Sequence, residues 1–448
     1  MRLLDPLFTT IEMREVFSTR ATLQGMLDFE AALTRALVET HNAPAGVLVP
    51  IQQNCKAELY SAETIARQAA SAGNLAIPLL KLLTTAVDSA DESAGAFVHL
   101  GATSQDAIDT GAVLQIRAGL TLLDATLLKI ADRLAILAEE NQSTLLPGRT
   151  WMQQASPITL GLKFSGWLDA IVRHRARFAE AHAQVSFLQF GGAVGTLAAL
   201  GSSGRAIATA LARQLHLALP PVPWHAHRDR IAHVATTLGL LVGTLGKIAR
   251  DISLMSQHEV AEAFEPGSPG RGGSSTMPHK RNPVGAAVIL SAAIRVPALV
   301  STMLAAMVQE HERGLGGWHA EWETLPEIFL LTDGAANQLS AILDGLQIDR
   351  EAMARHVADA NALTLSEAVA VALTRFVGRE AAHKSVASAV RLASESKLSF
   401  PEALLKDPSV IRHLSAAEID NLLNPKNYLG SAETMTAQVI ADYRNRKP

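Results

Sequence analysis

Apolar residues recur at alternating three- and four-residue intervals in two long stretches of the chain. The positions are Val113, Ile116, Leu120, Leu123, Leu127, Ile130, Leu134 and Leu137 in the first stretch, and Ile231, Val234, Leu238, Leu241, Leu245, Ile248, Ile252 and Met255 in the second. Neither stretch contains proline, so each predicts a single helix of about 30 residues. Helices of this length are typical of helix bundles.

Other faces of the same helices are apolar as well. These positions are Leu122, Leu128, Ile136, Leu240 and Val242. A helix with more than one apolar face must be covered on more than one side. Gly239, Gly243 and Gly246 allow a neighbouring backbone to come close, at a cost of about 1 kcal/mol each in helix propensity. The pattern favours burial inside an oligomer, with a large monomer as the alternative.

Polar, glycine-rich stretches interrupt the helical pattern at residues 99–106, 147–153 and 265–283. After Asp349 the helices become shorter, with prolines at 401, 408 and 425 between them. We therefore predict an N-terminal helical domain over 1–110, a central long-helix domain over 111–350 and a C-terminal helical domain over 351–448. The central domain carries the loop at 267–283.

Composition narrows the function classes. Lys and Arg number 39 against 43 Asp and Glu, so there is no basic field for nucleic acid or an anionic membrane. The most membrane-like window, 284–308, has Arg295 and Pro297 in its middle and fits a buried helix better than a membrane span. A single cysteine, Cys55, excludes an internal disulfide and a cysteine-based metal site. We expect a cytoplasmic protein.

Candidate chemistry is concentrated in residues 272–283, GGSSTMPHKRNP. Lys280, Arg281, Asn282 and the N–H groups of the helix that follows Pro283 can together hold a carboxylate or a phosphate. A solvated glycine-rich turn is the alternative. Upstream, a near match to a P-loop lacks its lysine, because Gly273 occupies that position. No metal or cofactor is expected.

Residues 273–282 resemble the signature loop of the fumarase/aspartase superfamily, whose pattern is G-S-S-x-M-P-x-K-x-N. Residues 99–110 and 148–161 resemble that family's first and second substrate-binding segments, in the same order. The resemblance implies an all-α, three-lobed subunit whose central helices form a homotetrameric bundle with active sites shared between subunits. It also implies elimination or addition at the carbon β to a carboxylate, through a carbanion at carbon α.

The resemblance implies roles for individual residues. Ser274, or its neighbour Ser275, would transfer the proton, and Lys280 and Asn282 would hold the carboxylate that takes up charge. The implied substrate-binding residues are Thr103 and Ser104 from the first segment, Gln153 from the second, and His99, which matches a histidine of adenylosuccinate lyases. A supporting structural role for His99 remains open.

The second segment departs from the family pattern T-H-x-Q, because it reads Thr150-Trp151-Met152-Gln153. An indole does not exchange protons at neutral pH as a histidine does. Hydroxide and amine leaving groups need an acid, whereas a carboxylate leaves unaided and adds in its ionised form, since its conjugate acid has a pKa of about 4. The departure favours an intramolecular addition of a carboxylate, which gives a lactone.

The detailed resemblance is to the lactonising branch of the superfamily, the 3-carboxy-cis,cis-muconate cycloisomerases of protocatechuate breakdown in the β-ketoadipate pathway. It is carried by residues 150–153, 189–193, 309–313 and 318–323. It implies a small tricarboxylate substrate, with Trp151 and Arg313 in the site. Arg149 and Arg313 are alternatively structural ion pairs. The remaining alternatives are an adenylosuccinate lyase-like β-elimination enzyme and a catalytically silent structural relative.

Overall fold

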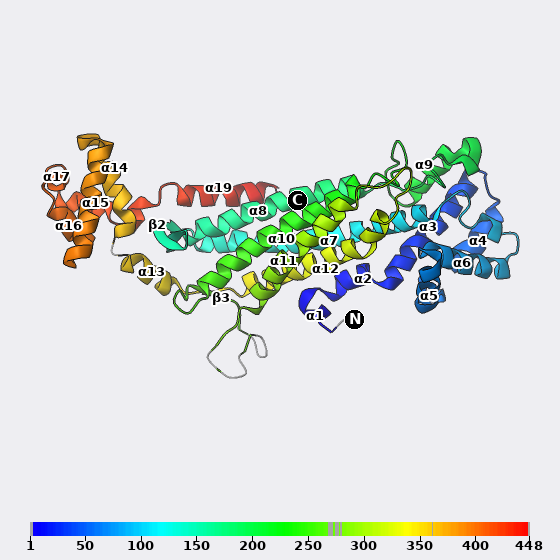
Figure 1. Ribbon diagram of the computed structural model, residues 1–448, viewed down its shortest axis with the longest axis horizontal. Coiled ribbons are helices and arrows are strands. Elements are labelled where there is room, and N and C mark those ends of the chain that lie inside the picture. The colour runs from blue at the N-terminus through cyan, green and yellow to red at the C-terminus, as the bar shows by residue number, and fades with distance from the viewer. Residues whose placement is uncertain (1–2, 268–271, 274–276, 278–279, 361, 447–448) are drawn as a thin grey trace. The chain divides into compact units, whose positions relative to one another are not determined.

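The computed structural model describes residues 3–267, 272–273, 277, 280–360 and 362–446. Helices dominate this part of the chain (Figure 1), as the predicted all-α class requires. The helices of eight or more residues are α3 (Thr19–Glu39), α5 (Ala62–Ala72), α6 (Ala76–Ala90), α7 (Ser104–Glu140), α8 (Leu160–Val185), α9 (Gly204–Gln214), α10 (Asp229–Met255), α11 (Val284–Ala305), α12 (Gly317–Asp344), α13 (Arg350–Asp359), α14 (Ser366–Val377), α15 (Arg379–Ser396) and α19 (Ala432–Arg446). The shorter ones are α1 (Asp5–Phe8), α2 (Ile11–Val16), α4 (Leu48–Asn54), α16 (Phe400–Leu405), α17 (Pro408–Ile411) and α18 (Ala416–Leu422).

The two helices predicted from periodicity are α7 and α10. Every seam position in both is buried, so the two predictions are confirmed. The off-seam faces differ, because Ile136 and Leu240 are 42% and 57% exposed while Val242 is fully buried. The chain alone therefore leaves part of the apolar surface of these helices uncovered.

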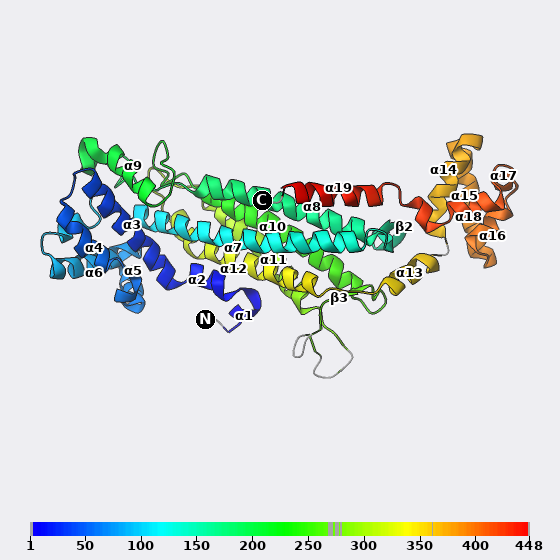
Figure 2. The ribbon, with the colours of Figure 1, turned by 180° about the vertical axis from the view of Figure 1, so that it is seen from behind.

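The chain forms two compact units. The first unit comprises Met1–Leu128, His174–Lys247 and Ala287–Leu339, and the second comprises Lys129–Arg173, Ile248–Ala286 and Ser340–Pro448. Within the first unit, parts of α7, α10, α11 and α12 run side by side (Figures 1 and 2). The division into three domains at residues 110 and 350 stays a prediction.

Two glycines of α10 explain how closely α11 approaches it in the first unit. A Cβ atom at Gly239 would lie 3.0 Å from Val300 Cγ2, and one at Gly246 would lie 2.8 Å from Ala293 Cβ. Side chains at these positions would push the helices apart. A Cβ at Gly243 would meet nothing within 4 Å, so this glycine faces open space in the single chain.

The second unit contains a feature that helical periodicity did not predict. Residues expected as a loop form an antiparallel hairpin of β1 (Leu145–Thr150) and β2 (Gln153–Thr159). A second short pair joins β3 (Ala263–Phe264) to β4 (Gln347–Ile348). The C-terminal helices pack around their own apolar cluster, which includes Val369, Leu373, Phe400, Leu404 and Ile419.

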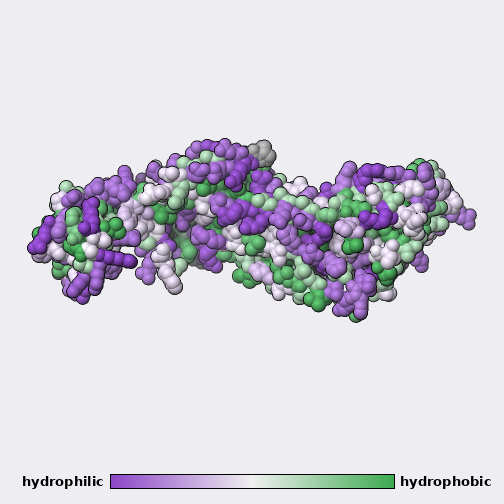
Figure 3. Space-filling view, turned by 90° about the horizontal axis from the view of Figure 1, so that it is seen from above, coloured by the Kyte–Doolittle hydropathy of each residue, from purple (hydrophilic) through white to green (hydrophobic). Residues whose placement is uncertain are grey.

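Two described helices, α10 and α11, are long and apolar enough to cross a membrane by length and composition. In the single chain, 61% of the most apolar window of α10 is buried, against 33% of that of α11. Ile294 on α11 is 78% exposed. Figure 3 shows one face of the molecule, where hydrophobic patches alternate with hydrophilic ones. Both helices therefore pack against protein, and α11 keeps a large apolar surface free.

Candidate active site

The predicted first substrate-binding segment, residues 99–110, runs into the start of α7. Asp106 lies in the first turn of α7, and its Oδ2 accepts the backbone N–H of Thr103 at 2.9 Å. This is half of a capping box, in which an acid in the first turn reaches back to the N-cap residue. Ser104, the first residue of the helix, is half-buried. The sequence Thr-Ser-Gln-Asp thus sets the backbone of the predicted binding residues.

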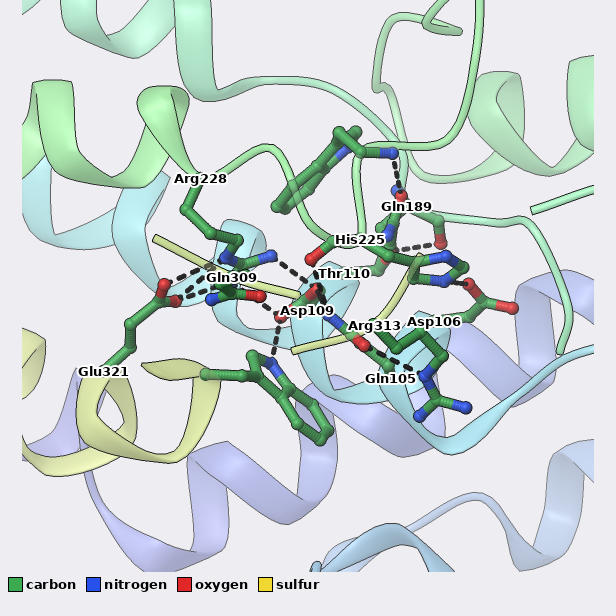
Figure 4. A network of polar contacts seen from close by, with 12 residues as sticks. Gln105, Asp106, Asp109, Thr110, Gln189, His225, Arg228, Gln309, Arg313 and Glu321 are labelled. Atoms are coloured by element: carbon green, nitrogen blue, oxygen red, sulfur yellow. Dashed lines mark hydrogen bonds and ion pairs between the residues drawn. The ribbon is translucent and has the colours of Figure 1, made fainter. Parts of the chain in front are cut away.

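Asp106 also joins this segment to two distant loops of the first unit. Its carboxylate accepts the N–H groups of Gly191 at 3.0 Å and Gly192 at 2.9 Å, and its Oδ1 lies 2.7 Å from His225 Nε2. The Asp106 side chain is fully buried. Because every contact is directional, this one carboxylate fixes how the three loops meet (Figure 4).

Arg313 reaches the same segment from the loop before α12. Its Nη1 donates to Thr103 Oγ1 at 2.8 Å. Its Nε donates to Gln105 Oε1 at 3.2 Å, a contact that Figure 4 shows. A guanidinium beside a hydroxyl at a helix start is a suitable donor set for a carboxylate. Arg313 forms no ion pair among the described residues. The structure thus unites two predicted substrate-binding residues, Thr103 and Arg313.

A buried ion-pair network lies next to this pair. Arg228 binds the carboxylates of Asp109 at 2.8 and 3.0 Å and of Glu321 at 2.9 and 2.6 Å, and Trp318 Nε1 donates to Asp109 at 2.9 Å. Burial disfavours the charged guanidinium, yet the two carboxylates outweigh it and raise the pKa of Arg228. Gln105 Nε2 donates to Asp109 at 3.1 Å, which connects this network to Arg313.

His99 is held by a buried carboxylate. Its backbone N–H donates to Glu30 Oε2 at 3.0 Å, and its Nδ1 lies 2.6 Å from Glu30 Oε1. Burial lowers the pKa of His99, but Glu30 and then Asp106 outweigh it, so the pKa is raised overall. His99 also has a φ of 59°, in the left-handed region. The ring is thus held in one orientation by Glu30.

The second substrate-binding segment is the hairpin, and its turn residues are Trp151 and Met152. Both have positive φ, at 52° and 66°, and their exposed fractions are 95% and 76%. A two-residue turn with positive φ at both positions is a type I′ turn, which favours Asn-Gly. Gln153, the first residue of β2, is exposed beside them. A bulky apolar pair in this turn is strained, and such strain is typical of functional sites.

Arg149 fixes the hairpin just before its turn. Its guanidinium makes a bidentate pair with the fully buried carboxylate of Glu262, at 2.8 and 2.6 Å. His356 Nδ1 lies 2.8 Å from the same carboxylate. Arg149 is therefore a structural ion pair, the alternative that its sequence left open.

The signature loop is closed at its base by Glu265. The carboxylate of Glu265 accepts the N–H groups of Gly285 at 2.9 Å and Ala286 at 2.7 Å, in the first turn of α11. The expectation that the start of this helix binds a substrate anion is therefore wrong for these N–H groups, because the protein's own carboxylate occupies them.

Within the signature loop, Arg281 is also engaged, since its Nη1 donates to Gln347 Oε1 at 2.9 Å. Lys280 is exposed and Asn282 is half-buried, with the Asn282 N–H donating to Gly272 O at 2.8 Å. Ser274 and Ser275, the predicted proton-transfer residues, lie outside the described residues. The predicted roles of Lys280 and Asn282 stay predictions.

Sequence reasoning missed several residues that organise the site: Glu30, Asp106, His225, Arg228 and Glu262. Two of them had a local signal. Asp106 completes a Thr-x-x-Asp capping pattern, and Glu30 is an acid among the buried apolar positions of α3. The other three act through partners far away in the chain, so no short pattern marks them.

Comparison with known proteins shows the family to which the chain belongs. A family model described as "Lyase" matches residues 8–298, and one described as "Adenylosuccinate lyase C-terminus" matches residues 362–439. The chain therefore belongs to this lyase family.

Among its relatives, the 3-carboxy-cis,cis-muconate cycloisomerase of Pseudomonas aeruginosa is 51% identical over 442 residues, which cover 99% of this chain and 96% of that protein. The crystal structure of the 3-carboxy-cis,cis-muconate lactonizing enzyme from Pseudomonas putida matches with a TM-score of 0.93 and 48% identity, over 99% of each chain. A nitrosuccinate lyase from Streptomyces davaonensis is 35% identical over 446 residues, 98% of this chain and 94% of that protein.

Proposed function

We propose that this protein is an enzyme that lactonises 3-carboxy-cis,cis-muconate to 4-carboxymuconolactone. The observation that carries the proposal is the hairpin tip, which presents the indole of Trp151 where related lyases have a proton-donating histidine. The anion-binding pair of Arg313 and Thr103 adds a site for a substrate carboxylate. The full-length identity to cycloisomerases supports the same reaction.

Bond formation needs no general base in this reaction. One terminal carboxylate of the substrate, already ionised at neutral pH, attacks the carbon β to the other terminal carboxylate. A C–O bond forms, and the π electrons of the double bond move to carbon α and its carboxylate. The attacking group belongs to the same molecule, so binding in the cyclic conformation supplies most of the required orientation. Arg313 and Thr103 hold one carboxylate in place.

The remaining steps concern negative charge and a proton. Lys280 and Asn282 stabilise the charge that develops on the carboxylate next to carbon α. Ser274 or Ser275 then delivers a proton to carbon α, which completes the lactone. These roles rest on the match of residues 273–282 to the loop pattern of the superfamily. The reaction is written without a metal or cofactor, since addition of a carboxylate to a conjugated acid requires neither.

We further propose a cytoplasmic homotetramer in which subunits share active sites. The exposed apolar residues Leu240 and Ile294, on α10 and α11, support contacts between subunits. Exposure of Trp151 at the hairpin tip supports insertion of that tip into a neighbouring subunit. In this proposal α10 and α11 face other subunits, and no segment enters a membrane or binds nucleic acid.

A β-elimination like that of adenylosuccinate lyase is the second candidate. Two observations favour it: the match of residues 362–439 to the adenylosuccinate lyase C-terminus, and the raised pKa of His99, which makes it a candidate acid. Against it, Trp151 cannot protonate an amine leaving group. A silent structural relative is the remaining outcome.

The test is an ultraviolet assay with 3-carboxy-cis,cis-muconate and no added cofactor. Wild type should remove the diene absorbance, Ser274→Ala and Lys280→Met should not, and the control Lys129→Met, on the exposed side of α7, should behave like wild type. If wild type leaves the diene intact but cleaves adenylosuccinate, the second candidate is correct. If it turns over neither compound, the silent relative stands.

A further inference from the structure

His99 and Glu30 form a pair that the reaction above does not use. Glu30 lies on α3, and its side chain is 1% exposed. One of its carboxylate oxygens contacts the ring of His99, and the other accepts the backbone N–H of the same residue. An ionised carboxylate only accepts hydrogen bonds, so the proton in this contact is on His99 Nδ1. The ring therefore has a fixed tautomer and a fixed direction.

The backbone of His99 is held in an unusual conformation. Its φ of 59° is in the left-handed region, which is uncommon for residues other than glycine, although Asn, Asp and His adopt it more often than the rest. Glu30 compensates by binding the N–H that this conformation presents. The buried carboxylate of Glu30 therefore holds both the backbone and the ring of His99 in place.

This turn leads directly to the anion-binding pair. The N–H of Ala102 donates to His99 O at 3.2 Å, and Thr103 follows with its hydroxyl on Arg313. His99, Thr103 and Arg313 are thus presented by one short segment and the loop that contacts it. A substrate with three carboxylates requires more than one cation, and Arg313 supplies one beside Thr103.

We propose that Glu30 is a positioning residue that keeps His99 as an imidazolium, so that His99 joins Arg313 in binding the carboxylates of the substrate. This inference rests on the proposed function for the identity of the substrate. Charge balance supports it, since a carboxylate buried this deeply needs a positive partner, and the ring of His99 contacts Glu30 Oε1 while the His99 backbone N–H donates to Glu30 Oε2.

The other charged groups around the pair are few. Asp106 on α7 also faces His99 and favours its charged form. Asp28 and Arg35 act electrostatically on Cys55, as Glu30 does. Burial, and then Glu30 and Asp28, raise the pKa of the Cys55 thiol, so Cys55 stays neutral and does not balance the charge of Glu30.

The pair predicts a characteristic dependence on pH. A carboxylate partner raises the pKa of His99, so the ring is charged below that pKa and loses its charge as the pH rises through it. Substrate binding should weaken over the same range. In Glu30→Gln the ring should lose its charge at lower pH, and KM should begin to rise at lower pH than in wild type.

The first experiment combines proton NMR titration of His99 with steady-state kinetics. In Glu30→Gln we expect a lower His99 pKa and a kcat/KM that falls about tenfold to a hundredfold, mostly through KM, since one charge-assisted contact is weakened. Glu39→Gln is the matched control, because Glu39 is on the same helix but pairs with Arg213 at the surface. An unchanged His99 pKa in Glu30→Gln overturns the proposal.

A double-mutant cycle separates positioning from general stability. In a His99→Gln background, adding Glu30→Gln should change kcat/KM little, because Glu30 acts through His99. Additive losses overturn the proposal and make Glu30 merely structural. Should Glu30→Gln not fold, Glu30→Asp keeps the charge and the cycle is run with that variant. The NMR titration needs no turnover, so its result stands even if wild type fails to lactonise the muconate.

Discussion

The first substrate-binding segment and the hairpin tip are built in opposite ways. In the first unit, Thr103 and Arg313 stand on a buried network of Asp106, Asp109 and Arg228, in which each charge has a partner. In the second unit, Trp151 extends from a strained turn and is almost fully exposed. The charged groups of the first region find their partners within the chain, whereas the second region presents an almost fully exposed side chain.

The two regions therefore contribute to activity at different costs in stability. The buried network of the first unit stabilises the fold, and it also fixes the geometry of the residues proposed to bind an anion. The hairpin tip costs stability as it stands, because a bulky pair occupies a turn that favours Asn-Gly. Substitutions in the buried network and in the turn should therefore affect stability in opposite directions, while both reduce activity.

The largest effect is expected at Arg228. Arg228→Met leaves Asp109 and Glu321 buried without their shared partner, which should lower the free energy of unfolding by about 3–5 kcal/mol. Denaturant unfolding followed by circular dichroism measures this loss. Arg67→Met, which removes an exposed pair with Glu63, is the control and should change stability little. A small loss in Arg228→Met would show that the network is not the support of this region.

Arg313 should separate binding from stability. Arg313→Met removes a charge-assisted contact with the substrate and should weaken its binding by about 1.5–3 kcal/mol, seen as a higher KM, while the melting temperature changes little. Arg313→Lys should recover only part of the binding, because an ammonium lacks the planar fork of the guanidinium. Equal KM values in all three proteins would remove Arg313 from the site.

Substitution at the hairpin tip should raise the stability of the protein rather than lower it. Replacing Trp151 and Met152 together by Asn and Gly relieves the positive-φ strain and should stabilise the hairpin by about 1 kcal/mol. The same change should abolish lactonisation if Trp151 meets the substrate. Thermal melting and the ultraviolet assay measure the two effects. A variant that is both more stable and fully active would mean that the turn has no role in the reaction.

The smallest effect on the single chain is expected at Ile294, on the exposed apolar face of α11. Ile294→Glu should alter the stability of an isolated subunit by less than about 0.5 kcal/mol, as most surface changes do. In a tetramer the same charge would be buried between subunits and should cause dissociation. Light scattering gives the mass directly, and an unchanged mass for wild type and variant would contradict the proposed contact.

Much of the fold was predictable, because the apolar seams from Val113 to Leu137 and from Ile231 to Met255 have a strict helical period. Tertiary packing buries these same positions, so local pattern and packing agree. The hairpin was not predictable, since Trp-Met is a poor turn sequence and takes its conformation from the strands and from Arg149. Of the candidate site, Thr103 and Arg313 were predicted through the family resemblance, and the structure places them in contact. Glu30 is 69 residues from His99, so only the folded chain reveals their pairing.

Running the reaction in heavy water tests the central claim most directly, that an ionised carboxylate adds and a proton is then delivered to carbon α. The account predicts that 3-carboxy-cis,cis-muconate loses its diene absorbance without added cofactor and yields a lactone with one deuterium on the carbon next to the side-chain carboxylate. Lactone without deuterium at that carbon, or a substrate left unchanged by active, folded protein, would contradict it.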